Sequence, residues 1–374
     1  MKRIAVFGST GSIGVQTLNV VRRFPHEFSV VALSGGGNTG LLARQICEFS
    51  PALAASVRQF SAPDGTRVFF GEDAAERMAE ECEADICVMA ISGLAALPPL
   101  MKIISRGCRI ALANKEAIVC AGDIVLSAAE ASGSEIIPVD SEHSAVFQCL
   151  AAGRKEDVKR IILTASGGPF YSDASVDLDA VTPEMALRHP TWNMGGKITV
   201  DSATMVNKGL EIIEAHRLFG IKNVDYVIHP ESIVHSLVEY KDNSTVALMS
   251  YPNMELAIQY ALTYPGRMEN AGVRAFDFAR SLTFHAPDEK RFPAPAIARR
   301  CTEIGGTAPA IYSIADEVAV SLFLKNRVRF TDICGIIEEA LSINEIERSF
   351  GYDDLLRLAA ETANYFGRKF GVKL

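Results

Sequence analysis

Acidic side chains that could bind a cation follow an apolar run near the middle of the chain. Residues 136–139 (Ile-Ile-Pro-Val) lead into Asp140, Ser141, Glu142 and His143. If the strand stays extended past this run, alternate side chains share a face, so Asp140 and Glu142 lie close together. Two such carboxylates repel unless a proton, a base or a cation lies between them. Mg²⁺ and Mn²⁺ prefer oxygen ligands of this kind. The residues therefore predict a divalent-metal site, with a solvated strand end as the alternative.

A second polar cluster surrounds the start of an expected helix that begins at Asn207. Asn207 fits the N-cap position, and Ser202 and Lys208 lie beside the helix start. The unpaired amides and the positive dipole end of a helix attract anions, so we expect a phosphate-binding site here. Glu211 lies one turn into the helix, where it could reach a metal ion near the same place. Glu214, three residues further along the helix and on a nearby face, is the alternative to Glu211 as metal ligand.

A glycine-rich turn opens the chain. Gly8, Gly11 and Gly14 separate a buried strand over residues 4–8 from a helix over residues 13–21. Such a turn lets backbone amides and the helix N-terminus meet a pyrophosphate, which predicts a dinucleotide site. A tight turn without a ligand is the alternative.

The end of the second expected strand, over residues 28–33, indicates which dinucleotide binds. An enzyme that uses NAD usually has an acidic residue there to hold the ribose hydroxyls. Residues 34–39 are Ser-Gly-Gly-Gly-Asn-Thr, and no acid follows until Glu48. This favours NADP, with small polar groups and backbone amides around the 2′-phosphate.

Strands and helices continue to alternate after this first unit. Strands are expected over residues 84–92 and 109–114, and helices over residues 94–105 and 123–131. This alternation predicts the α/β class, with an N-terminal Rossmann-like, doubly wound parallel sheet at residues 1–140. Sites in such sheets lie beyond the carboxyl ends of the strands, where the sequence places Asn114, Lys115 and Glu116.

The remaining two thirds of the chain change in pattern. We expect a central α+β catalytic domain at residues 141–263, in which a loop near residues 186–197 carries the only tryptophan, Trp192, and forms a lid. A proline-containing linker is expected at residues 264–296 and a C-terminal helical bundle at residues 297–374. His216 and His229 are expected to be structural.

Composition excludes several classes of protein. The net charge of −8 argues against a nucleic-acid-binding protein, whose surface would be basic. We find no apolar segment long enough to span a bilayer and no signal-peptide pattern. The eight cysteines include no CxxC pair, which favours reduced thiols in a cytoplasmic protein.

Six segments together resemble one enzyme family. The segments are GSTGSIG, ALANKE, PVDSEHSAVFQ, TASGGPF, HPTWNMGGKITVDSATMVNKGLE and HPESIVHS, and their colinear match to 1-deoxy-D-xylulose 5-phosphate reductoisomerase extends over nearly the whole chain. The resemblance implies that the protein rearranges the skeleton of a phosphorylated ketose and reduces the resulting aldehyde with NADPH. The product, 2-C-methyl-D-erythritol 4-phosphate, leads to isoprenoid precursors. The resemblance also implies Mg²⁺ or Mn²⁺, with Co²⁺ as a further candidate, and a homodimer.

The resemblance assigns roles to individual residues. It implies that the metal ligands are Asp140, Glu142 and Glu211. It implies that Lys115 and Ser141 contact the reacting end of the substrate, that Trp192 and Met194 belong to the lid, and that the substrate phosphate is held by Ser166, Ser202, Asn207, Lys208 and His189. The expected cofactor contacts are Thr10, Gly11, Ser12, Ile13, Gly36, Asn38, Asn114, Glu116 and Gly195.

The chain departs from the family pattern at two places. The family often has a lysine in the turn after the second strand, and this chain has Gly37, which weakens the case for strict NADP preference. The family's Asn-Ala-Ala-Asn-Glu is replaced by Ser-Ile-Ala-Asp-Glu at residues 313–317, which we interpret as a structural variation outside the chemistry.

Two other functions compete with this hypothesis. Another NADP-dependent oxidoreductase, such as a semialdehyde dehydrogenase, would need a cysteine nucleophile in a polar site, and Cys120 and Cys149 lie in apolar segments. A non-enzymatic NADP-sensing protein would have no use for the acidic residues. The sequence leaves open the preferred metal and the proton-shuttling group, for which Lys115, His143 and a water on the metal are candidates.

Overall fold

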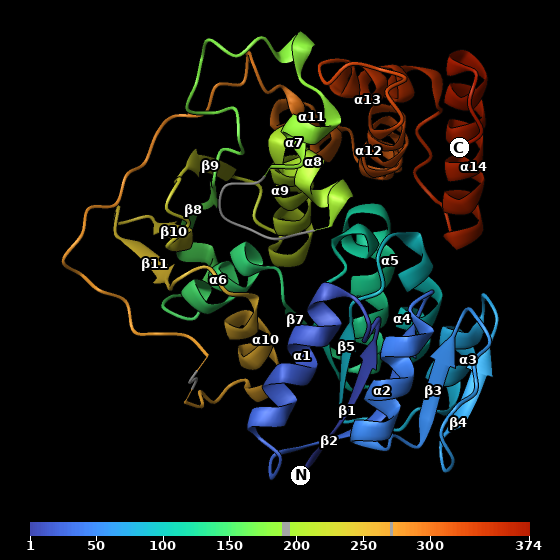
Figure 1. Ribbon diagram of the computed structural model, residues 1–374. Helices are drawn as coiled ribbons and strands as arrows, with labels where there is room; N and C mark the ends of the chain where they lie inside the picture. The colour runs from blue at the N-terminus through green and yellow to red at the C-terminus, as the bar shows by residue number, and fades with distance from the viewer. Residues whose placement is uncertain (189–194, 270–271) are drawn as a thin grey trace. The chain divides into compact units, whose positions relative to one another are not determined.

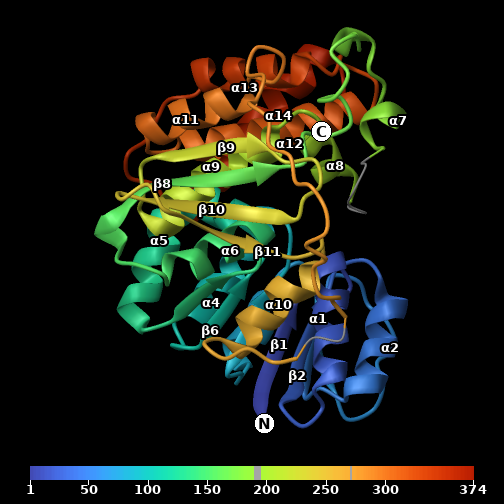
Figure 2. The same cartoon turned by 90° about the vertical axis from the view of Figure 1, so that its left-hand side faces the viewer.

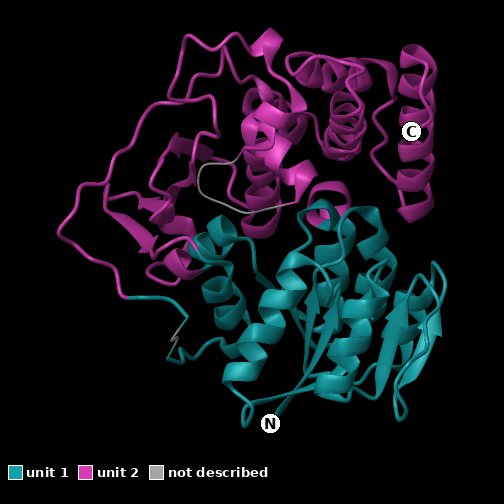
Figure 3. Ribbon diagram, in the orientation of Figure 1, with its two compact units in different colours: residues 1–117, 123–147, 253–274 teal, residues 118–122, 148–252, 275–374 magenta. Residues whose placement is uncertain are grey.

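The computed structural model describes residues 1–188, 195–269 and 272–374. These residues form two compact units, which Figure 3 colours separately. Unit 1 comprises residues 1–117, 123–147 and 253–274, and unit 2 comprises residues 118–122, 148–252 and 275–374. Each unit combines distant segments of the chain. Residues 253–274, which the sequence analysis divided between the catalytic domain and the linker, belong to unit 1.

A seven-stranded sheet forms the centre of unit 1. Its strands are β1 (Lys2–Phe7), β2 (Phe28–Gly35), β3 (Leu53–Ser56), β4 (Arg67–Phe70), β5 (Ile86–Met89), β6 (Arg109–Leu112) and β7 (Glu135–Pro138). The order is β4-β3-β2-β1-β5-β6-β7, and every neighbouring pair is parallel. The direction of strand addition reverses between β1 and β5, which is where ligands bind in doubly wound sheets. The predicted Rossmann-like sheet is confirmed.

Helices connect most of these parallel strands, because each crossover must return the chain to the same edge. They are α1 (Ser12–Arg23), α2 (Thr39–Phe49), α3 (Ala74–Glu81), α4 (Leu97–Ile104) with the short 3₁₀ turn Leu94–Ala96 before it, and α5 (Lys115–Ser132), whereas β4 follows β3 without a helix. Unit 1 also contains most of α6 (Ser141–Leu150), which follows β7, and α10 (Met254–Thr263). The helix expected over residues 94–105 is confirmed, with prolines in the first turn of α4. In Figure 1, α1 and α2 lie in front of β1 and β2, and α10 lies beside α1.

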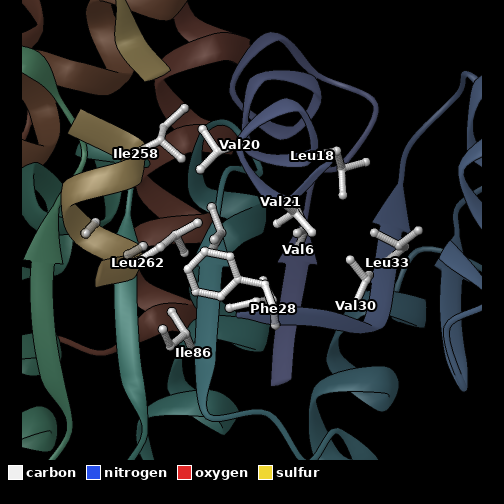
Figure 4. Close-up of a cluster of buried hydrophobic side chains, with 14 of the residues drawn as sticks. Val6, Leu18, Val20, Val21, Phe28, Val30, Leu33, Ile86, Ile258 and Leu262 are labelled. Carbon is white, nitrogen blue, oxygen red and sulfur yellow. The ribbon is translucent and has the colours of Figure 1, made fainter. Parts of the chain in front are cut away.

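Apolar side chains from α1, the first strands and α10 form one buried cluster (Figure 4). Val6 and Val21 come from β1 and α1, while Ile258 and Leu262 come from the much later helix α10. Burial of each such side chain stabilises the fold by about 1.5–3 kcal/mol. Glu255 adds an ion pair with Arg23. These contacts explain why a segment after residue 250 belongs to the N-terminal unit.

Unit 2 contains a smaller, mixed sheet (Figure 2). Its strands are β8 (Val158–Ala165), β9 (Val224–Ile228), β10 (Val234–Tyr240) and β11 (Thr245–Met249), in the order β11-β10-β8-β9. Strand β10 is antiparallel to β8 and β11, whereas β8 and β9 are parallel. The backbone of His285 bonds to that of Ile228 at 2.9 and 3.0 Å, so the expected linker adds one bridge to the edge of this sheet.

The helices of unit 2 pack on this sheet and on one another. They are α7 (Pro183–Ala186), α8 (Gly196–Ala203), α9 (Val206–Phe219), α11 (Ala294–Ile304), α12 (Ala308–Leu324), α13 (Asp332–Ile343) and α14 (Tyr352–Phe370), with 3₁₀ turns at Lys155–Asp157 and Leu178–Ala180. Helix α9 packs on β9 and on α11, and α12 contacts α13 and α14. The helical C-terminus is therefore confirmed, and Gly371 ends α14 in a left-handed conformation, as its position predicted. Among the described residues, no helix is long and apolar enough to cross a bilayer.

Candidate functional site

The glycine-rich turn after β1 packs so closely against neighbouring backbone that Gly8 and Gly14 leave no room for a side chain. Gly8 has a φ of +88°, and a β-carbon there would lie 2.5 Å from the carbonyl oxygen of Ala90. A β-carbon on Gly14 would lie 2.3 Å from the carbonyl oxygen of Gly8, so α1 begins directly against the turn. Gly11 occupies the N-cap of α1 without any side-chain cap. The amide groups of the first turn of α1 can therefore meet an anion.

Two polar side chains that the sequence analysis did not assign hold this turn in place. The hydroxyl of Ser34 accepts a hydrogen bond from the amide of Gly8 at 2.9 Å. The side chain of Gln45 accepts from the hydroxyl of Ser9 at 2.7 Å and donates to its carbonyl at 2.8 Å. Ser34 is buried, so its hydroxyl supports the turn and is not exposed to a bound phosphate.

The carboxylate of Asp140 lies between two basic side chains of unit 1. Lys115 Nζ is 2.6 Å from Asp140 Oδ2, and His143 Nδ1 is 3.4 Å from Asp140 Oδ1. Burial raises the pKa of Asp140, but the positive charge of Lys115 and the hydrogen bond with His143 outweigh it, so this pKa lies well below its usual range. Asp140 is therefore ionised at neutral pH.

The path of the chain after Asp140 differs from the expectation. Strand β7 ends at Pro138, and helix α6 begins at Ser141, so Asp140 and Glu142 do not alternate along an extended strand. Asp140 accepts a hydrogen bond from the amide of Glu142 at 3.3 Å. This bond satisfies an amide at the helix start, and such capping favours helix over continued strand. The two carboxylates are brought together by a helix start and not by strand alternation.

In unit 2, the carboxylate of Glu211 is held by polar side chains of its own helix. Lys208 and Asn207 both contact it, and Lys208 also donates to the carbonyl of Thr164 at 2.5 Å. Lys208 and Glu211 are 3% and 1% exposed, so this pair is buried. Lys208 and Glu211 are thus fixed relative to the end of β8.

Ser166 and Ser202 lie on two segments that pack closely. Ser166 follows β8 and precedes Gly168, whose φ is +69° and whose β-carbon would lie 2.9 Å from the carbonyl oxygen of Ser202. Ser202 lies near the end of α8. The turn after β8 therefore lies directly against α8, as a shared phosphate site would require.

The expected N-cap at Asn207 is wrong. The N-cap of α9 is Met205, with a φ of +62°, and Asn207 lies inside the first turn. Residues before it form α8, where the sequence analysis assigned no helix. The side chain of Asn207 bonds to Glu211 and does not cap the helix. Met205 offers no side-chain cap to α9, and the hydroxyl of Thr204 accepts a hydrogen bond from the amide of Val206 at 3.4 Å.

The remaining predicted residues occupy defined positions. Asn38 and Asn114 cap α2 and α5 through hydrogen bonds to Leu41 at 3.1 Å and Ala117 at 2.7 Å. Asn114 also donates to the carbonyls of Ile91 and Gly93, so it links β6 to the loop after β5. Of the predicted site residues, unit 1 contains Thr10, Gly11, Ser12, Ile13, Gly36, Asn38, Asn114, Lys115, Glu116, Asp140, Ser141 and Glu142, and unit 2 contains Ser166, Gly195, Ser202, Asn207, Lys208 and Glu211. His189, Trp192 and Met194 lie outside the described residues.

Histidine 229 is structural, as expected. It is fully buried, its Nδ1 lies 2.7 Å from the carbonyl of Thr283, and its Nε2 accepts from two backbone amides at 3.1 Å. Its ring stacks on Phe284 at 4.7 Å. These bonds attach the segment before His285 to the end of β9.

The donor groups fit both a dinucleotide and a hard cation. The uncapped start of α1 offers backbone amides to a pyrophosphate, and Asp140 and Glu142 offer only carboxylate oxygens. The parallel sheet, its reversal point and the glycine-rich turn define a Rossmann-like, dinucleotide-binding α/β protein with an acidic site beside the sheet.

Comparison with known proteins identifies the family. Residues 4–122 match the family model described as 1-deoxy-D-xylulose 5-phosphate reductoisomerase, and residues 136–219 and 249–365 match two models of its C-terminal domains. The chain is 45% identical over 381 residues to the 1-deoxy-D-xylulose 5-phosphate reductoisomerase of Caldanaerobacter subterraneus, covering 99% of this chain and all of the relative. It is 47% identical to that of Anaeromyxobacter dehalogenans over 93% of this chain and 92% of the relative.

Solved structures agree with this assignment. The Zymomonas mobilis enzyme in complex with NADPH has a TM-score of 0.90 and 36% identity, with 99% of each chain covered. A reductoisomerase in complex with NADPH, fosmidomycin and magnesium has a TM-score of 0.91 and 34% identity, covering 99% of this chain and 98% of that chain. The chain belongs to the 1-deoxy-D-xylulose 5-phosphate reductoisomerase family.

Proposed function

We propose that this protein converts 1-deoxy-D-xylulose 5-phosphate to 2-C-methyl-D-erythritol 4-phosphate by skeletal rearrangement and reduction, with NADPH and a divalent metal ion. The observation that supports this function most strongly is the family match along nearly the full chain at 45% identity. The related structures that contain NADPH and magnesium support the same cofactors. The protein is thus an NADP-dependent oxidoreductase of the isoprenoid precursor pathway.

Unit 1 contributes the cofactor site and part of the metal site. The uncapped start of α1, with Thr10 to Ile13, binds the cofactor phosphates, and the turn at Gly36 and Asn38 faces its adenosine end. Asp140 and Glu142 supply carboxylates to the metal ion, and we assign the third ligand to Glu211 of unit 2. When bound, the metal ion polarises substrate oxygens as a Lewis acid and NADPH supplies the hydride.

The chain's own residues orient the substrate and control its protons. Ser166, Ser202, Asn207 and Lys208 hold the phosphate, with His189 alongside, so that remote binding energy positions the reacting carbons. Lys115 and Ser141 contact the reacting end, where Lys115 places a positive charge 2.6 Å from Asp140. Trp192, Met194 and Gly195 belong to the segment that covers the bound molecules and excludes water.

The competing dehydrogenase hypothesis lacks its nucleophile. Burial raises the pKa of the Cys149 thiol to about 11, so this thiol is protonated at neutral pH. Cys120 is buried as well. Neither cysteine is suited to form the covalent intermediate that a semialdehyde dehydrogenase requires.

The decisive experiment follows NADPH oxidation with 1-deoxy-D-xylulose 5-phosphate, with and without Mg²⁺ or Mn²⁺. We expect oxidation only with metal, and a branched product when the carbon skeleton is traced by NMR. Reduction that leaves the skeleton linear would replace this function with the simple oxidoreductase.

Three further assignments accompany this function. We assign the protein to the cytoplasm, because the cysteines of the described residues form no disulfide bond and disulfides are rare in reducing compartments. We also assign it a homodimeric state and a division into a cofactor domain, a catalytic domain and a helical domain, in which residues 253–274 belong with the cofactor domain. Light scattering of the purified protein tests the dimer, which a monomeric mass would exclude.

A further inference from the structure

The turn after β2 has an arginine next to it that comes from the end of the neighbouring strand. A β-carbon on Gly37 would lie 3.8 Å from both Cζ and Nε of Arg58, so the guanidinium group lies at ordinary contact distance from this turn. Gly37 is the position at which the family often carries a lysine. The turn therefore has a cationic side chain at this place, supplied by a residue 21 positions later in the sequence (58 − 37).

The backbone before Arg58 is fixed against the same turn. Strands β2 and β3 are parallel, and their register pairs Gly35 with Ser56. The buried hydroxyl of Ser56 lies 2.7 Å from the carbonyl oxygen of Arg58 and 3.4 Å from that of Gly36. One hydroxyl thus connects residues 56–58 to the turn, which keeps the origin of the arginine side chain beside Gly37.

The guanidinium group of Arg58 is available to a ligand. The side chain is exposed, and among residues 1–188, 195–269 and 272–374 no carboxylate forms an ion pair with it. Of the other polar side chains of the turn, the Ser34 hydroxyl bonds to the amide of Gly8, and the side-chain oxygen of Asn38 caps α2. The turn carries no acidic residue that would hold a ribose hydroxyl pair in place of a phosphate.

We propose that Arg58 binds the 2′-phosphate of NADPH and sets the preference for NADPH over NADH. Arg58 thereby takes the role of the lysine that the family often has at the position of Gly37. The carboxyl end of β2 is where doubly wound sheets place the adenosine ribose. A guanidinium group presents paired N–H donors that match phosphate oxygens, and these charge-assisted bonds are stronger than neutral ones. The proposal rests on the use of NADPH in the proposed function.

Direct binding tests the proposal without turnover. NADPH, NADH and adenosine 2′,5′-bisphosphate are titrated into the full-length protein, by nucleotide fluorescence or calorimetry, for the native chain and for Arg58→Ala. We expect Arg58→Ala to raise the Kd for NADPH and for the bisphosphate by about 10-fold or more, and the Kd for NADH by less than about 2-fold. The matched control is Arg67→Ala, which removes the same charge from the amino end of β4, away from the carboxyl ends of β2 and β3, where Arg67 pairs with Glu81.

A double variant separates a phosphate contact from a structural role. Gly37 has no positive φ, and among the described residues a β-carbon there has only Arg58 atoms within 4 Å, so Gly37→Lys is compatible with the turn. We expect Gly37→Lys combined with Arg58→Ala to recover most of the NADPH affinity. Equal effects of Arg58→Ala on NADPH and NADH, or an unchanged NADPH affinity, would overturn the role of Arg58. Absence of NADPH binding by the native chain would instead overturn the proposed function.

Discussion

Lys115 Nζ lies 2.6 Å from Asp140 Oδ2, and this contact joins the first residue of α5 to the second residue after β7. The two side chains are only 9% and 12% exposed. Their charges therefore interact in a poorly solvated region, where the partners strongly affect each other's protonation. In the proposed function the same carboxylate binds a cation, so the lysine and the metal ion both neutralise it.

This contact predicts how Lys115→Met behaves without metal. The variant leaves Asp140 buried beside His143 without the lysine charge, which we expect to lower the free energy of unfolding by about 3 kcal/mol. Added Mg²⁺ should recover part of this loss, because a ligand of the folded state stabilises it by mass action. Urea titrations with and without Mg²⁺ measure both effects. Lys102→Met is the control, since the pair of Lys102 with Glu80 at 2.6 Å is exposed to solvent and contributes little to stability. Equal losses in the two variants would contradict the special position of Lys115.

Asp140→Asn should separate catalysis from cofactor binding. The amide keeps the shape of the side chain and removes the charge that a metal ion needs, so we expect turnover to fall by about 1000-fold or more. The glycine-rich turn lies elsewhere in the same unit, and the Kd for NADPH should change by less than about 3-fold. Steady-state kinetics and NADPH fluorescence measure the two quantities. A parallel loss of both would count against a metal-binding role.

Lys208→Ala tests the phosphate site. We expect loss of its charge-assisted bonds to raise KM for the phosphorylated substrate by about 2 kcal/mol, or roughly 30-fold. Because Lys208 is buried against Glu211, the variant should also unfold at a lower temperature. Lys222→Ala, which removes an exposed lysine of unit 2, is the control for net charge. An unchanged KM would remove Lys208 from the phosphate site even if stability falls.

Variants of Asp316 test whether the second departure from the family pattern, at residues 313–317, has a structural role. It is fully buried in α12 and forms an ion pair with Lys197, which also lies 2.7 Å from Asp201. Asp316→Ala should lower the free energy of unfolding by about 3 kcal/mol. Asp316→Asn restores the residue usual in the family and keeps an acceptor for Lys197, so we expect a smaller loss. Thermal unfolding of the two variants compares them, and equal stability of Asp316→Ala and the native chain would contradict this role.

The ion pair of Glu339 and Lys369 should make a pH-dependent contribution to the free energy of unfolding. Lys369 Nζ lies 2.5 and 2.6 Å from the two carboxylate oxygens of Glu339, and this hydrogen bond holds the pKa of Glu339 below its usual value of 4.5. A lowered carboxyl pKa stabilises the fold above the unfolded pKa, and this contribution is lost as the pH falls through the folded pKa. Both groups are partly exposed, so Lys369→Ala should cost about 0.5 kcal/mol at pH 7. The difference from the native chain should shrink below about pH 4.5 in urea titrations, and a difference that grows there would contradict this linkage.

Much of unit 1 could be predicted from local patterns. Glycine spacing after β1 and the alternation of apolar runs with helical periods are local signals, and they predicted the strands, the turn and the parallel sheet. Strands β3 and β4, four residues each, were missed. Helix α10 was assigned to another domain, because its packing on α1 connects residues more than 200 positions apart, as in the 3.3 Å bond from Asn19 to Glu255.

The sequence by itself determined the family, the glycine-rich turn and the residue types that we expect to bind phosphate and metal. Tertiary structure alone decided which charges meet. Lys115 faces Asp140, Arg58 lies beside Gly37, and Lys197 pairs with Asp316. It also decided that the chain enters a helix after Asp140, where the residue pattern allowed a strand. The reason is physical: periodicity and turn preferences act between near neighbours, whereas burial and charge pairing depend on which segments the fold brings together.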